Sequence, residues 1–163
     1  MCGRYTLFRL EQLLKNFPWL AIPPGIGPRY NIAPTQPVLA VANDRPDRLD
    51  LFHWGLIPSW AKDPAIGNRM INARGETLAE KPAFRTALQR RRCLIPADGF
   101  YEWRRDADGG KTPMYLRMKS GDPFMFAGLW ESWHDPGRSE LRSCTIITTT
   151  PNSLVESIHD RMP

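Results

Sequence analysis

Residues 93–104, CLIPADGFYEWR, combine alternating apolar and polar positions with β-favouring aromatic residues. Alternation along the run Gly99–Arg104 places Phe100 and Glu102 on one face of a strand, and the two remaining aromatic residues on the other. The Asp-Gly-Gly turn at 108–110 then predicts a hairpin. In this half of the chain we expect five strands: Cys93–Ile95, Gly99–Arg104, Met114–Met118, Phe124–Trp130 and Ser143–Thr149.

The first half of the chain predicts a mixture of short strands and helices, because sixteen prolines interrupt any long helix. Strands are expected at Arg4–Phe8, Val38–Ala42 and Leu49–Ile57, helices at Leu10–Phe17, Thr77–Arg91 (broken at Pro82) and Leu154–His159, and loops at Pro18–Pro37 and Trp60–Asn72. The sequence shows no internal repeat and no domain boundary. We therefore expect one α+β domain over residues 1–163, with short helices around a curved, mostly antiparallel, barrel-like sheet.

Composition favours a cytoplasmic protein with a true core. Hydrophobic residues make up 42% of the chain, which contains neither an apolar leader nor an apolar run long enough to span a membrane. The three cysteines are widely separated, so neither a disulfide framework nor a zinc site is indicated, and we expect no metal and no cofactor. The net charge of +5, carried mainly by arginine, is a weak indication of a nucleic-acid partner.

Cys2 follows the initiator Met1 directly. Removal of Met1 would leave an α-amine and a thiol on the same residue, a 1,2-aminothiol. Such a group condenses with an aldehyde to a Schiff base, and the thiol then closes a thiazolidine ring in an intramolecular step of high effective molarity. The alternative is that a cysteine at this position is an accident of composition.

Three further polar residues lie in settings, apolar or charged, where a pKa is easily shifted. Asn72 could orient a substrate through its amide, or could simply stabilise a turn. Glu102 could be a desolvated carboxylate that shuttles protons, or a solvent-facing residue of an edge strand. His159, between Asp160 and Arg161, could act as an acid or base near neutral pH, although a lone histidine is more often structural.

Six motifs, taken in order, resemble those of the SOS response-associated peptidase family, whose members are described as abasic-site processing proteins. They are Met1-Cys2-Gly3-Arg4, Tyr30-Asn31-Ile32-Ala33-Pro34, Trp54-Gly55-Leu56-Ile57-Pro58-Ser59-Trp60, Asn72-Ala73-Arg74-Gly75-Glu76-Thr77, Ala97-Asp98-Gly99-Phe100-Tyr101-Glu102-Trp103 and His159-Asp160-Arg161-Met162-Pro163. The resemblance extends from Cys2 to the last residue. Family members usually continue for several dozen residues beyond the last motif, so we expect this domain to lack the usual C-terminal segment.

The resemblance implies covalent capture of the ring-opened abasic site in single-stranded DNA as a thiazolidine cross-link. It makes Cys2 the nucleophile, Asn72 the residue that holds the N-terminus and the opened sugar, Glu102 a proton shuttle and His159 an aid to ring opening and reversal. The DNA contacts that it implies are Arg4, Asn31, Pro34, Trp60, Arg74, Thr148 and Arg161. The expected partner is single-stranded DNA that contains abasic sites, bound by a monomer without a membrane or a metal.

Two other functions remain open at this stage. In one, Cys2 with His159 as base is a thiol autopeptidase that removes Met1, and a lyase side reaction through the Schiff base also stays open. In the other, the chain is a non-covalent single-stranded DNA-binding module, for which the thiol of Cys2 would be dispensable.

Overall fold

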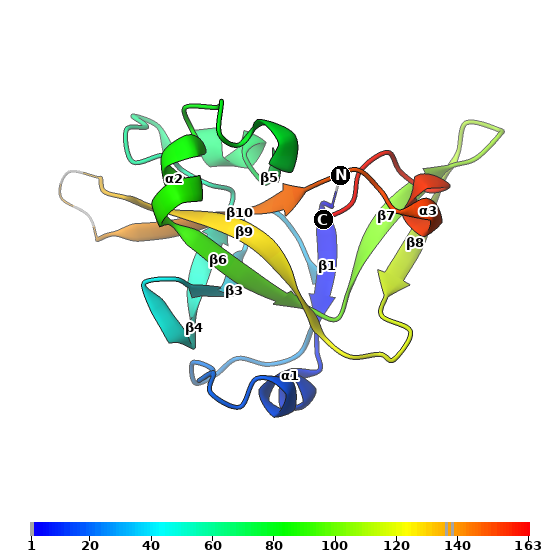
Figure 1. Ribbon diagram of the computed structural model, residues 1–163, viewed down its shortest axis with the longest axis horizontal. Coiled ribbons are helices and arrows are strands. Elements are labelled where there is room, and N and C mark those ends of the chain that lie inside the picture. The colour runs from blue at the N-terminus through cyan, green and yellow to red at the C-terminus, as the bar shows by residue number, and fades with distance from the viewer. Residues whose placement is uncertain (1, 136, 138) are drawn as a thin grey trace.

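The computed structural model describes residues 2–135, 137 and 139–163. Its core is a five-stranded barrel in which the strands pair in the order β4-β3-β6-β9-β10, and a parallel pairing of β10 with β4 closes the ring (Figure 1). The barrel strands are β3 (Pro37–Ala42), β4 (Arg45–Trp54), β6 (Arg92–Ala97), β9 (Phe124–Trp133) and β10 (Leu141–Thr148). The predicted α+β class with a barrel-like, mostly antiparallel sheet is confirmed.

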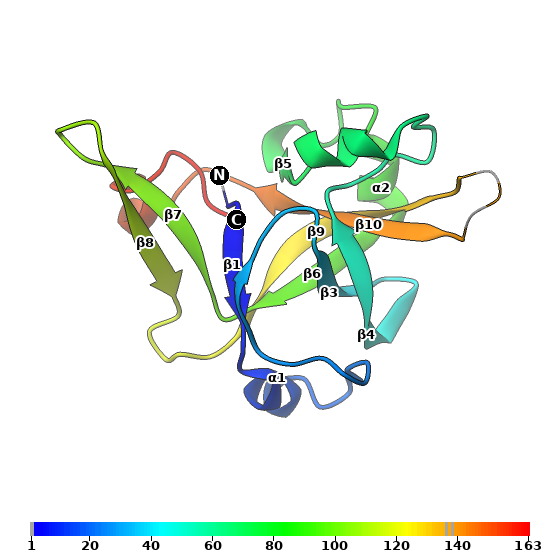
Figure 2. The same ribbon diagram turned by 180° about the vertical axis from the view of Figure 1, so that it is seen from behind.

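A second, four-stranded antiparallel sheet lies beside the barrel in the order β2-β1-β7-β8. Its strands are β1 (Arg4–Leu7), β2 (Arg29–Ile32), β7 (Gly99–Arg105) and β8 (Lys111–Arg117). The inner face of this sheet packs on the barrel through Tyr5, whose ring meets Trp54 and Phe126 edge-on at centroid distances of 5.3 and 5.6 Å. The β7–β8 hairpin extends away from the barrel, at the right of Figure 1 and the left of Figure 2.

The helices are short, as the prolines predict: α1 (Leu10–Asn16), α2 (Arg85–Arg90) and α3 (Ser153–Glu156), with 3₁₀ turns η1 (Pro64–Arg69) and η2 (Gly75–Thr77). The expected helix Thr77–Arg91 is mostly wrong. Only its part after Pro82 is α-helical, because proline removes a backbone donor and clashes with the preceding turn. In the described part of the chain, no helix is both long and apolar enough to cross a membrane.

Two strands lie in segments that we expected to be loops. β2, a strand of four residues, falls within the proline-rich segment 18–37 and pairs with β1. The three-residue β5 (Asn72–Arg74) pairs in parallel with β10 at the end of the expected loop Trp60–Asn72. Both strands are too short to show a periodic pattern, and their partners are distant in sequence. Tertiary pairing forms these strands, not local propensity.

The N-terminal strand and the C-terminal segment meet at the same end of the molecule. In both views the last residues pass beside the start of β1 (Figures 1 and 2). The C-terminal segment is joined to the chain beyond β10 by an antiparallel bridge between Thr149 and Met162. This arrangement brings Cys2 and the last sequence motif into one region.

A contact between two glycines fixes the segment that leads from β4 to β5. Gly55 has a φ of +139°, and a Cβ built on it would lie 2.6 Å from the carbonyl oxygen of Gly67 in η1. A Cβ on Gly67 would in turn lie 2.7 Å from the carbonyl oxygen of Gly55. Both positions therefore require glycine, and their contact sets the path of the chain towards Asn72.

We expect Gly55→Ala to lower the free energy of unfolding by about 2–3 kcal/mol, because the new methyl group meets backbone atoms and the backbone conformation is strained for alanine. Urea denaturation measures this loss. Gly27→Ala is the matched control, since Gly27 has no heavy atom within 4 Å of its Cβ position and no positive φ. Equal urea midpoints for the two variants would show that the glycine contact does not constrain the fold.

Candidate functional site

Cys2 lies at the head of β1 with an exposed fraction of 0%. Its carbonyl oxygen accepts a hydrogen bond of 2.9 Å from the side-chain amide of Asn72. Asn72 is the first residue of β5 and pairs with Ile146 of β10. Because β5 pairs with β10, the side-chain amide of Asn72 lies beside the N-terminal strand. The structure therefore brings together two of the predicted site residues, Cys2 and Asn72.

The Cys2 thiol is held in its neutral form. Burial, and after it the nearby negative charge of Glu102, raise the pKa of the thiol to about 12. The sulfur lies 3.9 Å from the carbonyl oxygen of Arg4, a contact that a thiol can make as a weak donor. At neutral pH this cysteine is therefore a thiol, not a thiolate.

Glu102 points from β7 into the molecule and is 2% exposed. Phe100 on the same face is also buried, whereas Trp103 is 37% exposed, so the predicted alternation is confirmed. β7 lies between β1 and β8 in the sheet, so the alternative of a solvent-facing glutamate on an edge strand is wrong. The structure therefore places a buried carboxylate beside the head of β1.

His159 follows α3 and faces Glu102. Its Nε2 lies 3.9 Å from Oε2 of Glu102. Its Nδ1 accepts a hydrogen bond of 3.0 Å from the backbone N–H of Arg161, which in a neutral imidazole leaves the proton on Nε2. The carboxylate of Asp160 lies 2.9 Å from the same Nδ1. This histidine can therefore hold or release a proton at the nitrogen that faces Glu102.

Arg161 holds the C-terminal motif against the rest of the site. Its two terminal nitrogens donate to the two carboxylate oxygens of Glu76, at 2.9 Å each, and one of them also donates to the carbonyl oxygen of Thr148 at 2.6 Å. These bonds lower the pKa of the Glu76 carboxyl, since they stabilise its charged form. Glu76 was not among the predicted site residues, although it lies within the motif 72–77.

The other residues predicted to contact DNA lie in different settings. Arg4 donates from Nη1 to the side-chain oxygen of Asn31 at 2.9 Å, which joins β1 to β2. Arg74 is exposed, and Trp60 is exposed to 61% on the segment before η1. Pro34 is half-buried between β2 and β3. Thr148 is fully buried, and its hydroxyl lies 3.5 Å from the carbonyl oxygen of Ala73 and 3.3 Å from Nη2 of Arg161.

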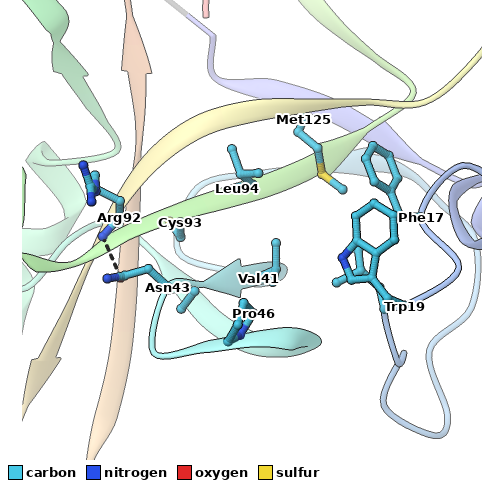
Figure 3. A pocket seen from close by; sticks show the side chains of 11 residues that line it. Phe17, Trp19, Val41, Asn43, Pro46, Arg92, Cys93, Leu94 and Met125 are labelled. Atoms are coloured by element: carbon cyan, nitrogen blue, oxygen red, sulfur yellow. Dashed lines mark hydrogen bonds between the residues drawn. The ribbon is translucent and has the colours of Figure 1, made fainter.

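Two pockets differ in their relation to this site. One of about 670 Å³ opens beside His159 and is lined by Trp103, Arg104, Arg105 and residues of 151–160. The other, of about 280 Å³, is apolar and is lined in part by residues that directly follow α1 (Figure 3). α1 lies at the end of β1 opposite the N-terminus (Figure 1). Its walls include Phe17, Trp19, Val41, Leu94 and Met125. The first pocket therefore belongs to the site and the second does not.

Two further predictions concern the removal of Met1 and the expected absence of a metal site. The removal of Met1 lies outside the described residues, because the structure describes the chain from Cys2 onward. Across residues 2–135, 137 and 139–163, no three His, Cys, Asp or Glu side chains are grouped to hold a metal ion.

Comparisons with known proteins give a consistent result. The family described as "SOS response associated peptidase (SRAP)" matches residues 1–163. The chain is 52% identical to "Abasic site processing protein YoqW" of Bacillus subtilis (strain 168), covering 100% of this chain and 75% of the relative. It is 31% identical to "Abasic site processing protein YedK" of Escherichia coli (strain K12), covering 100% and 74%. A crystal structure of a Bacteroides thetaiotaomicron protein superimposes with a TM-score of 0.89 at 27% identity, covering 99% and 75%.

We expect the thiols of the folded protein to resist alkylation. Burial raises the pKa of both Cys2 and Cys93 to about 12, and raises that of Cys144 well above its ordinary value. At about pH 8 the thiolate fraction is then very small, so iodoacetamide should react at least about a hundredfold more slowly than with the urea-unfolded chain. Raising the pH towards 12 should destabilise the fold, because the unfolded chain loses its thiol protons first.

Mass spectrometry of the alkylated chain assigns the rate to each cysteine. Fast modification of Cys2 in a sample whose circular dichroism is native would contradict the neutral, buried thiol.

Proposed function

Because the chain belongs to the SOS response associated peptidase (SRAP) family, we propose that it processes abasic sites in single-stranded DNA by covalent capture at Cys2. The observation that carries the proposal is the position of Cys2. Its main chain is held by the Asn72 amide, and its thiol is close enough to Glu102 for that charge to raise the thiol pKa. A cysteine needed only for packing requires neither contact.

The first chemical step uses the α-amine that removal of Met1 would expose. The amine attacks the aldehyde carbon of the ring-opened abasic sugar, and loss of water gives a protonated Schiff base. Glu102 accepts the proton that the attacking amine loses and returns it to the former aldehyde oxygen. A second proton, taken up from solvent, lets that oxygen leave as water, and the thiol proton released in the second step restores the balance. His159, which faces Glu102 through Nε2, supplies or receives the proton when the sugar ring opens.

The second step closes the ring. The sulfur of Cys2 adds to the iminium carbon, the carbon–sulfur bond forms and the thiol proton passes to Glu102. The sum is aldehyde plus aminothiol giving thiazolidine plus water. The raised thiol pKa suits this order, because the thiol stays neutral until a positively charged iminium lies beside it and favours its ionisation.

The strand itself is held by charge and by stacking. Arg4, Arg74 and Arg161 would contact phosphates, while Asn31, Pro34 and Trp60 would line the path. The buried Thr148 would act indirectly, through its contact with Arg161. The exposed indole of Trp60 suits base stacking. Arg161 has a second role, since its bonds to Glu76 and Thr148 fix the segment that carries His159.

The alternative hypothesis of a thiol autopeptidase is less well supported than covalent capture. A thiol peptidase depends on a thiolate paired with a protonated imidazole, which requires a lowered thiol pKa. Here burial and Glu102 raise it. The aminothiol route needs no preformed thiolate, so it agrees better with the electrostatics of the site.

We expect the protein to form a heat-stable adduct with a single-stranded oligonucleotide that carries one abasic site, seen as a shifted band on a denaturing gel. Cys2→Ala should give no heat-stable adduct, because without the thiol the Schiff base cannot close to a thiazolidine ring. A form that keeps Met1 should also give none, because the amine is blocked.

Undamaged single-stranded DNA serves as the control and should bind the wild type and Cys2→Ala with similar affinity. No adduct from a folded sample whose mass shows loss of Met1 would refute covalent capture and leave the non-covalent DNA-binding function.

Removal of the Glu102 charge should slow capture without weakening binding of the strand. We expect Glu102→Gln to lower the rate of adduct formation by about 10²–10⁴-fold, the usual contribution of a positioned proton-transfer group. Quenched time courses at saturating protein measure this rate.

Glu131→Gln is the matched control, because Glu131 is a buried glutamate of β9 that pairs with Arg91 at 3.0 Å, outside the site. Capture by Glu102→Gln at the rate of the Glu131→Gln control would exclude the proton-shuttle role.

A further inference from the structure

The four-stranded sheet has a second face, turned away from the barrel. Directly opposed residues of antiparallel strands point to the same face, and the register pairs Arg4 with Tyr101, Tyr101 with Tyr115, and Gly99 with Arg117. Their neighbours Tyr5 and Phe100 point into the core. These paired residues therefore form the outer face of the sheet.

Tyr115 lies across this face. A Cβ on Gly99 would come within 2.5 Å of its ring, and its hydroxyl lies 2.8 Å from the hydroxyl of Thr6. The ring thus passes from β8 over β7 towards β1, with the ring of Tyr101 at a centroid distance of 5.0 Å. Tyr115 is nevertheless 39% exposed. The result is a fixed aromatic surface open to solvent.

A β-bulge adds a second aromatic ring at the edge of the face. Tyr5 pairs with Ile32 and Leu7 with Arg29, so two residues of β2, Tyr30 and Asn31, oppose the single residue Thr6 of β1. Such a bulge turns both extra side chains to one side. Tyr30 is 62% exposed and stacks on Phe8 at a centroid distance of 5.0 Å and an interplanar angle of 21°.

The charge of the outer face is positive. By register, the positions of β7 and β8 on this face are aromatic, basic, proline or glycine, and none is acidic. The basic side chains of the face are Arg4, Arg105, Lys111 and Arg117. Arg4 is also two residues from Cys2, so the face begins at the site and continues away from it.

We propose that this outer face binds the unpaired nucleotides that flank the abasic site, by stacking bases on Tyr115 and Tyr30 and by pairing phosphates with Arg4 and Arg117. The inference rests on the proposed function, because it gives the captured strand its path beyond Cys2. Fixed, exposed rings bordered by guanidinium groups suit single-stranded nucleic acid of any sequence. Adjacent strands lie about 4.8 Å apart, so the two steps from β1 to β8 span roughly 10 Å, the reach of a few nucleotides.

The test measures binding of an undamaged fluorescent oligothymidylate of about twenty nucleotides by anisotropy over a series of salt concentrations. Tyr115→Ala should weaken binding about tenfold, the usual loss for one stacked base. Arg117→Ala should lower the slope of log affinity against log salt by about 0.7, the value for one phosphate contact on a single strand. Tyr115→Phe keeps the ring and should bind as the wild type does.

Trp19→Ala is the matched control, since Trp19 is 62% exposed but lines the apolar pocket remote from the site (Figure 3). It should bind as the wild type does. Wild-type affinity and wild-type salt slope in both Tyr115→Ala and Arg117→Ala would overturn the proposal. The outer face would then bind a protein partner or be simply exposed to solvent.

Adduct formation with a short abasic oligonucleotide, assayed at saturating protein, separates this proposal from the proposed function. Normal adducts in Tyr115→Ala together with weaker binding of the long strand would support both. Absence of adducts even in the wild type, with the same loss of long-strand binding in the variants, would support the face and refute covalent capture.

Discussion

The hydrogen bond from the Asn72 amide to the carbonyl oxygen of Cys2 is the contact on which the site depends. It joins the N-terminal strand of one sheet to the short parallel strand that borders the barrel, and so connects the two sheets at the reactive residue. Asn72 reaches this position only because β5 pairs with β10, and because the Gly55–Gly67 contact directs the chain there. A local feature of the site is thus the product of long-range pairing.

The electrostatics of the site follow from the same burial. Removing the Cys2 thiol from water favours its neutral form, and the nearby negative charge of Glu102 strengthens that effect. His159 faces this pair from a segment that is fixed by the ion pair of Arg161 with Glu76. The result is a site in which a buried, neutral thiol, a buried glutamate and a histidine lie together, as the proposed capture requires.

Much of this arrangement could be predicted from the sequence. The α+β class, the main strands and the position of Glu102 on the same face as Phe100 followed from alternation and from the prolines, which act locally. Alternation left open whether that face points into the core. β2, β5 and the closing β4–β10 pairing could not be predicted in this way, because each depends on a partner distant in the chain. The role of Glu76 was missed for the same reason, since its partner Arg161 is 85 residues away.

Because β10 closes the barrel but is synthesised late, the N-terminus exists for some time before the fold that buries it can form. Cys2 emerges from the ribosome well before β10 and the His159 segment, which are encoded more than 130 residues later. At roughly 5–20 residues per second, the N-terminus waits about 8–30 s for them. If Met1 is removed during translation, a free aminothiol is then exposed to metabolic aldehydes without its pocket. Under the proposed function, burial of Cys2 in the completed fold would shield the terminus from small aldehydes, and rapid folding would preserve the capacity of each molecule to capture DNA.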